Sequence, residues 1–323
     1  MIRINNHNIK SIANNFYKNA KMHINLKIGG SKENLFVKEN LKKIMLCEPK
    51  DFNKLIKDVK LKRLNNKKLK LMIVGDKNNY FGYQKFSKKG IKQYNAYNLA
   101  KDLNINVCSY CNINYTHTLK GKTVKINGRN RVKSTRPEFD HFMSKSDHPI
   151  LGMSFYNLIP SCHVCNSSIK STAEFNLSEH LHPYVDDFNN IKQITVTGCP
   201  LSMIQKEEDF EIIFTDRTPS SQTSDSFVKK RNNKASKCVE DFALETLYQP
   251  HKDRILELVD FSRKYNKDSF NNLVNEFQKE TEIFKTSNDV KRLLLCHHIE
   301  DKNINKRPFN KLAKDIAVQL DLL

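Results

Sequence analysis

The chain has 323 residues, an apolar fraction of 38% and a formal net charge of +20. This length allows a sizeable buried core, but no run approaches the ~18–20 apolar residues of a transmembrane helix. The first residues also lack the apolar segment of a secretory signal, so the sequence argues against a membrane or secreted protein. We expect a cytoplasmic protein, in which paired cysteines indicate a metal site rather than a disulfide.

The positive charge is concentrated in the first half of the chain. Residues 1–107 contain 24 Lys and Arg against 7 Asp and Glu, a net charge of +17, and residues 108–170 contain 9 against 3, a net of +6. Residues 171–323 contain 22 against 25, a net of −3. A general bias toward lysine would not stop at residue 170, so this distribution favours a polyanionic partner such as nucleic acid.

Three regions are predicted in chain order. A basic, mainly helical region spans 1–100, with helical patterns over 33–46, 50–62 and 86–103 and a short apolar run over 69–74 that predicts a buried strand. Region 101–190 should contain a hairpin over 113–127 with its turn at Gly121, a further turn at Asn127-Gly128, a strand around Asp140-His141 and a helix from near Cys165.

The third region, 191–323, begins with two strand patterns and continues as helices. The strands cover 191–197 and 209–215, and the helical patterns cover 227–250, 252–266, 268–285, 287–299 and 308–321. The expected fold class is therefore α+β, with helices predominating.

Two Cys-x-x-Cys pairs frame the middle of the chain. Cys108 and Cys111 form the first, and Cys162 and Cys165 follow after fifty intervening residues. Four thiolates are a soft, tetrahedral ligand set that suits a structural Zn²⁺. Because four protein ligands close the site, this zinc should not be the catalytic metal. His163 could replace one ligand, but the four cysteines suffice.

Residues inside the cysteine frame suit phosphodiester hydrolysis. This reaction needs a base to deprotonate water and a cation to stabilise the charged phosphorus centre. Asp140 and His141 are adjacent on a predicted strand, so their side chains should face opposite ways, one toward a metal and one toward water. Asn166 can add an amide oxygen to the metal site. An Mg²⁺ or Mn²⁺ ion held by Asp140 and Asn166 would keep coordination positions open for phosphate and water.

The order of these residues resembles that of the HNH, or ββα-metal, endonuclease superfamily of the zinc-knuckle-framed type. The matching motifs are Phe-Asp-His-Phe at 139–142, Tyr-Asn-Leu-Ile-Pro-Ser at 156–161 and Cys-Asn-x-x-x-Lys at 165–170. Bacterial HNH proteins of restriction and anti-phage defence are most similar. The resemblance implies an embedded ββα-metal finger, His141 as general base, Asp140 and Asn166 as ligands of the catalytic metal, and Asn157 as a brace of the loop.

Several basic residues near this core are candidate contacts to a nucleic acid. Lys170 follows Asn166 by four residues and should lie on the same helix face. The others precede or follow the active strand: Arg129, Arg131, Lys133, Arg136 and Lys145.

Three functional hypotheses follow. The leading one is a metal-dependent endonuclease that cuts DNA, with double-stranded DNA as the expected substrate. The second is a zinc-stabilised nucleic-acid-binding module without catalysis. The third is a nuclease effector subunit that stays silent until a protein partner, such as an ATPase or a sensor, releases it, because the helical residues 171–323 have no evident role in binding DNA.

Overall fold

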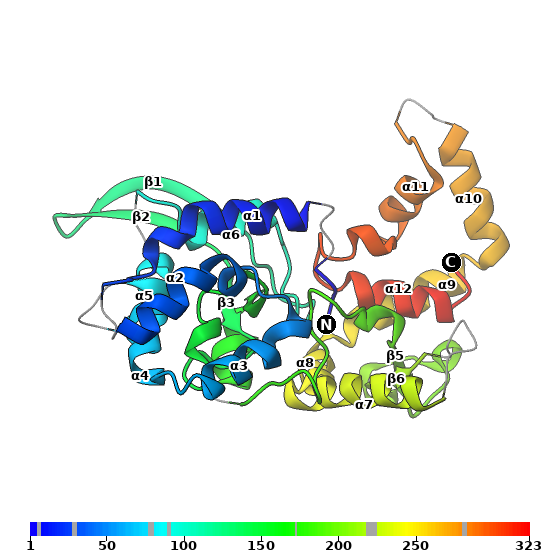
Figure 1. The fold of residues 1–323 in the computed structure, drawn as a ribbon. Helices are drawn as coiled ribbons and strands as arrows, with labels where there is room; N and C mark the ends of the chain where they lie inside the picture. Colours follow the sequence, from blue (N-terminus) through cyan, green and yellow to red (C-terminus); the bar gives the residue numbers. More distant parts are fainter. Residues whose placement is uncertain are drawn as a thin grey trace. The chain divides into compact units, whose positions relative to one another are not determined.

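The computed structural model describes residues 1–4, 8–27, 31–76, 81–88, 92–171, 173–217, 225–279 and 283–323. These residues are mostly helical, with three separate two-stranded antiparallel sheets, as the α+β prediction requires (Figure 1). None of the helices among them is both long enough and apolar enough to cross a membrane.

The chain forms two compact units. Unit 1 comprises Met1–Arg3, Asn106–Tyr115 and Asp186–Leu323, and unit 2 comprises Ile4–Ile105 and Thr116–Val185. The structure therefore groups most of the predicted regions 1–100 and 101–190 into a single unit, whereas the short segment around the first cysteine pair belongs with the C-terminal helices.

Unit 2 begins with short helices. They are α1 (Ile9–Ala20), α2 (Ser31–Met45), α3 (Phe52–Leu61), α4 (Asn66–Leu69), α5 (Gly82–Ser87) and α6 (Ala96–Leu103). Those predicted over 33–46 and 50–62 are confirmed by α2 and α3.

The buried strand predicted over 69–74 is wrong. Asn65 starts α4 by accepting a hydrogen bond from the backbone of Lys68, and the chain continues into the π-helical segment η3 (Lys70–Val74). Met72, Ile73 and Val74 are buried as predicted, but a short apolar run does not distinguish a buried strand from a buried helical turn.

The helix predicted over 86–103 is divided into α5 and α6. Asn95 forms a capping box at the start of α6, with its side chain accepting from Tyr97 N, so the helix begins at Ala96. Residues 89–91 lie outside the described part of the chain. Gly82 opens α5 at φ +55°, and a Cβ there would lie 2.0 Å from the carbonyl oxygen of Ile73.

The first sheet is a hairpin that turns at Asn127-Gly128, where a turn was predicted, and not at Gly121. β1 (Leu119–Ile126) pairs with β2 (Arg129–Thr135), and the connecting residues Asn127 and Gly128 have φ of +50° and +74°. Such positive values are typical of the two-residue turns that match strand twist. The predicted turn at Gly121 is therefore wrong, because this glycine lies within β1.

The second sheet holds the predicted catalytic pair. β3 (Glu138–His141) pairs antiparallel with β4 (Leu158–Ser161), with Asp140 opposite Ile159. The short π-helical segment η6 (Val164–Lys170) follows β4, where a helix was predicted, and packs against β3.

Unit 1 combines the third sheet with the C-terminal helices. β5 (Lys192–Thr197) pairs with β6 (Glu211–Asp216), which confirms both predicted strands. The helices are α7 (Asp225–Asp241), α8 (Leu244–Tyr248), α9 (Asp253–Lys264), α10 (Lys267–Lys279), α11 (Ser287–Leu294) and α12 (Asn310–Gln319).

The third sheet is fixed to the last helix. Asp315 and Gln319 on α12 hydrogen-bond to the backbone N and O of Ile194 on β5. The buried ammonium of Lys311 completes this contact, bonding to Asp315 at 2.8 Å and to the carbonyl of Lys192 at 2.7 Å. These contacts give the C-terminal segment a structural role within unit 1.

Candidate catalytic and metal sites

The four cysteines of the two predicted pairs lie together. The Sγ atoms of Cys108, Cys111, Cys162 and Cys165 are all within 4.8 Å of one another, all four residues are buried, and none forms a disulfide. In a tetrahedral site with Zn–S bonds of ~2.3 Å the sulfurs are about 3.8 Å apart, so this grouping suits one ion. The cysteines can therefore hold a metal such as zinc.

Local hydrogen bonds position the sulfurs in each pair. Cys111 Sγ accepts from the backbone N of Ile113 at 3.4 Å and from Asn114 Nδ2 at 3.9 Å. Cys162 Sγ accepts from the backbone N of Cys165 at 3.4 Å. Donors directed at sulfur favour the thiolate, which is the form that binds a metal.

The side chains of β3 divide between its two faces. Glu138 and Asp140, two residues apart, both bond to side chains of η6. His141 instead lies against Tyr83 of α5, with ring centroids 4.4 Å apart at 76°. The predicted divergence of Asp140 and His141 is therefore present, and it follows from the two-residue period of a strand.

A buried ion pair holds Asp140. Lys170 Nζ lies 2.8 and 2.7 Å from the two carboxylate oxygens of Asp140, and both side chains are less than a tenth exposed. The same ammonium donates to the carbonyl oxygens of His141 at 2.7 Å and Phe142 at 3.4 Å. Lys170 does lie on the same side of η6 as Asn166, but it is enclosed by oxygens of its own chain. It does not present the solvent-facing charge expected of a phosphate contact.

His141 has a defined tautomer. Its Nε2 lies 3.0 Å from the carbonyl oxygen of Gly152, and because a carbonyl can only accept, Nε2 carries the proton and Nδ1 is the acceptor. Burial, reinforced by the positive charge of Lys145, holds the pKa of His141 well below its ordinary value. The ring is therefore neutral at pH 7, with an unprotonated nitrogen able to take a proton.

Asn157 braces the loop between β3 and β4. Its Oδ1 accepts from Met143 N at 2.7 Å, and its Nδ2 donates to the carbonyls of Met143 at 3.0 Å and Leu151 at 3.2 Å. The side chain is fully buried and its backbone oxygen accepts from Phe142 N. These bonds fix the residues that follow His141, which is the bracing position predicted for Asn157.

Glu138 is a site residue that the sequence analysis missed. Its carboxylate accepts from Asn166 Nδ2 at 2.7 Å, Ser167 Oγ at 2.9 Å and His163 Nδ1 at 2.9 Å. Because Nδ2 of Asn166 is committed to Glu138, the amide orientation is fixed and Oδ1 is the atom left for a cation. The sequence did carry a usable signal: Glu138 lies two residues before Asp140 on the predicted strand, so its side chain points to the same face as that of Asp140.

The other residues predicted to contact nucleic acid are less deeply buried than Lys170, or their side chains lie outside the described part of the structure. Arg136 donates to the carbonyls of Pro137 at 2.6 Å and Ser87 at 3.1 Å, so its guanidinium is partly used within the fold. Lys145 is half-buried, with Nζ 5.6 Å from the ring centre of Tyr83. The side chains of two further predicted contacts, Arg129 and Arg131, lie outside the described residues, although their backbones form β2.

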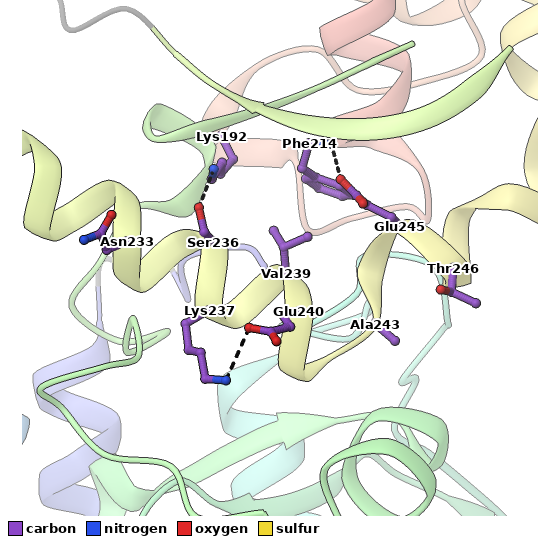
Figure 2. A pocket seen from close by; sticks show the side chains of 10 residues that line it. All are labelled: Lys192, Phe214, Asn233, Ser236, Lys237, Val239, Glu240, Ala243, Glu245 and Thr246. Atoms are coloured by element: carbon purple, nitrogen blue, oxygen red, sulfur yellow. Dashed lines mark hydrogen bonds and ion pairs between the residues drawn. The ribbon is translucent and has the colours of Figure 1, made fainter. Parts of the chain in front are cut away.

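A cavity of ≈ 650 Å³ lies elsewhere, in unit 1 between the third sheet and helices α7 and α8 (Figure 2). Its charged groups already have partners, since Lys192 donates to Ser236 at 2.8 Å and Lys237 pairs with Glu240 at 3.3 Å. Phe214 N donates to Glu245 at 2.9 Å on another wall. None of the predicted site residues lines this cavity, so it offers no argument for the predicted chemistry.

Comparison with other proteins adds nothing to this geometry: no family model, no curated protein and no solved structure matches the chain. Function must be argued from the site itself. There, β3 and η6 bring Glu138, Asp140, Asn166 and Lys170 together on one face, and the neutral ring of His141 occupies the opposite face.

Proposed function

We propose that the chain is a metal-dependent endonuclease of the HNH type that hydrolyses DNA phosphodiester bonds. The observation that carries the proposal is the state of His141 on β3, next to Asp140. A hydrogen bond of 3.0 Å to Gly152 fixes Nε2 as the protonated nitrogen and leaves Nδ1 as a base. The β3–β4 hairpin followed by η6 also has the ββα order of such enzymes, which supports the same assignment.

His141 is assigned the role of general base. As a water molecule attacks phosphorus, its proton passes to Nδ1 of His141, and the bond between phosphorus and the leaving oxygen breaks. The lowered pKa keeps the ring unprotonated before the reaction, and the bond to Gly152 holds its orientation. A Cβ at Gly152 would lie 2.6 Å from Cγ2 of Val74, so glycine is needed where this carbonyl approaches the histidine.

Asp140 and Asn166 are assigned to a divalent cation such as Mg²⁺ or Mn²⁺. Both carboxylate oxygens of Asp140 accept from Lys170, and a carboxylate oxygen that accepts a hydrogen bond can also ligate a metal. Asn166 offers Oδ1 because Glu138 holds its Nδ2. A cation bound there would neutralise the charge that develops on the phosphate and the leaving oxygen.

The direct test is nicking of supercoiled plasmid in Mg²⁺ or Mn²⁺, with EDTA added as a metal-free arm. We expect the parent chain to nick DNA once any activating partner is supplied, and His141→Ala to be inactive under the same conditions. His298→Ala serves as the matched control, since this half-exposed histidine lies in unit 1. If His141→Ala cuts as fast as the parent, the assignment of the base is wrong.

The burial of the site favours the partner-activated version of this enzyme over a constitutively active one. His141 and Asp140 are each only 6% exposed, and Lys170 encloses the carboxylate of Asp140. A substrate phosphate must reach both groups, so we propose that a partner protein exposes them. Robust cutting by the isolated chain, without any partner protein, would argue against this version.

A further inference from the structure

We propose that the β1–β2 hairpin is an arm that binds double-stranded DNA beside the catalytic strand. This inference rests on the proposed function and adds to it a specific surface and the duplex form of the substrate. The hairpin, here called the ribbon, comprises β1 (Leu119–Ile126), its two-residue turn and β2 (Arg129–Thr135).

The charge of the ribbon is entirely of one sign. Its seventeen residues contain six cations and no Asp or Glu, and the cations are distributed over both strands: Lys120, Lys122, Lys125, Arg129, Arg131 and Lys133. Among these, the side chains of Lys122, Lys125 and Lys133 are described, and all three are exposed. Six like charges on a two-stranded ribbon repel one another unless a polyanion neutralises them.

The ribbon is anchored at its base and connected directly to the catalytic strand. Ser134 Oγ donates to the hydroxyl of Tyr97 on α6 at 2.9 Å, and the guanidinium of Arg136 lies over the rings of Tyr97 and Phe139. Only Arg136 and Pro137 separate the end of β2 from the start of β3. DNA held along the ribbon is therefore held at a fixed position relative to His141.

The dimensions of the ribbon suit a duplex. Eight residues of β1 extend about 26 Å at ~3.3 Å per residue, and the major groove of B-DNA, ~12 Å wide, admits a two-stranded ribbon. In the described chain the ribbon pairs with neither of the other sheets, and it runs out as a long curved pair of strands (Figure 1). Isolated two-stranded hairpins are only marginally stable in water, so a partner bound along the ribbon would also stabilise it.

The alternative is that the lysines only protect exposed strand edges from aggregation. The two explanations differ in a measurable quantity, because lysines that contact phosphates release counterions and contribute to the salt dependence of DNA binding. Each such contact adds about 0.9 to the slope of log K against log salt concentration. Lysines that only protect an edge add nothing to that slope.

The test uses the full chain carrying His141→Ala, which prevents cutting, and measures fluorescence anisotropy on a labelled duplex and on a single strand of the same sequence. The ribbon variant is Lys122→Gln, Lys125→Gln, Lys133→Gln, and the matched control is Lys229→Gln, Lys230→Gln, Lys267→Gln, three exposed lysines of unit 1. We expect the ribbon variant to lose duplex affinity by at least about tenfold and to reduce the salt slope by about 2–3, with the control unchanged.

Lysine acetylation footprinting gives a second measurement that needs no substitution. Duplex DNA should protect Lys122, Lys125 and Lys133 from acetylation but leave Lys229 and Lys267 reactive. Unchanged affinity and slope in the ribbon variant, a loss no larger than in the control, or an equal loss on single strands would overturn the proposal.

The outcome separates this proposal from the nuclease assignment. If the parent chain nicks plasmid and the ribbon variant binds duplex normally, the ribbon proposal fails and the nuclease assignment stands. If the ribbon variant loses duplex binding but the parent never cuts, even with any activating partner, the ribbon proposal stands and the nuclease assignment fails.

Discussion

Replacing Lys170 by Met should destabilise the protein strongly, because Lys170 is buried beside a carboxylate. Its Nζ bonds to both oxygens of Asp140, at 2.8 and 2.7 Å, and to the carbonyl of His141 at 2.7 Å. Methionine has a similar length but no charge, so the variant would remove the ammonium that bonds to both oxygens of the buried Asp140 carboxylate.

The expected loss in the free energy of unfolding follows from the burial of both Lys170 and Asp140. Removing one member of a buried ion pair typically costs 3–5 kcal/mol, because the remaining charge is uncompensated. For a domain of 150–250 residues, each kcal/mol lost from the free energy of unfolding lowers the melting temperature by about 2–4 °C. A loss of about 3–5 kcal/mol should therefore lower it by about 6–20 °C. Replacing a solvent-exposed lysine, as expected of a phosphate contact, would lower the free energy of unfolding by less than about 0.5 kcal/mol.

The assay is urea unfolding of the parent and three variants, followed by far-UV circular dichroism because the chain has no tryptophan. The variants are Lys170→Met, Asp140→Asn and the double variant. We expect the double variant to recover most of the free energy of unfolding lost in Lys170→Met, because it removes the uncompensated charge. A cost below about 1 kcal/mol for Lys170→Met, or a double variant no more stable than the single one, would refute the buried pair.

Three further predictions concern the metal sites and the core. Cys165→Ser should reduce bound zinc from about one ion per chain to nearly none, measured by elemental analysis, with the free energy of unfolding falling in parallel. Glu138→Ala should weaken Mn²⁺ binding, followed by electron paramagnetic resonance, by about 10–100-fold because the Asn166 amide is freed, whereas Glu138→Gln, which keeps an acceptor, should bind almost normally. Burial lowers the pKa of His182 to about 3, so between pH 6.5 and about 3 the unfolded chain binds a proton that the folded ring does not. The free energy of unfolding therefore decreases as the pH is lowered through this range. His182→Phe should therefore lose about 3 kcal/mol less than the parent between pH 6.5 and 4 in urea titrations, and an unchanged pH dependence would contradict this.

The arrangement at β3 could be predicted because strand geometry is local. Two adjacent residues on a strand must diverge, so Asp140 and His141 were correctly expected on opposite faces. The paired cysteines were equally informative, since two Cys-x-x-Cys turns present four sulfurs that one metal ion can bind, and the structure brings the four together.

The depth of Lys170 could not be predicted. Its spacing from Asn166 indicated a shared helix face, which the structure has, but spacing does not distinguish an ammonium that reaches water from one that reaches a carboxylate. Glu138 was missed for the same reason, because its role depends on η6 packing across β3.

Two errors in secondary structure have local causes. The apolar run ending at Val74 is too short for its periodicity to separate a strand from a helical turn, although the cap at Asn65 was a usable signal. In the ribbon, the stronger turn former, Asn127-Gly128, determined the hairpin and Gly121 became part of a strand.

The most direct test of the proposed chemistry is a single-turnover cleavage rate on a defined duplex with saturating Mg²⁺, for the parent chain and for His141→Ala together with any activating partner. A general base contributes about 10²–10⁴-fold, so the rate should fall by this factor while duplex affinity stays the same. An equal rate in His141→Ala, or no metal-dependent cleavage by the parent on any duplex or single-stranded substrate, would contradict the assignment of His141 as the catalytic base.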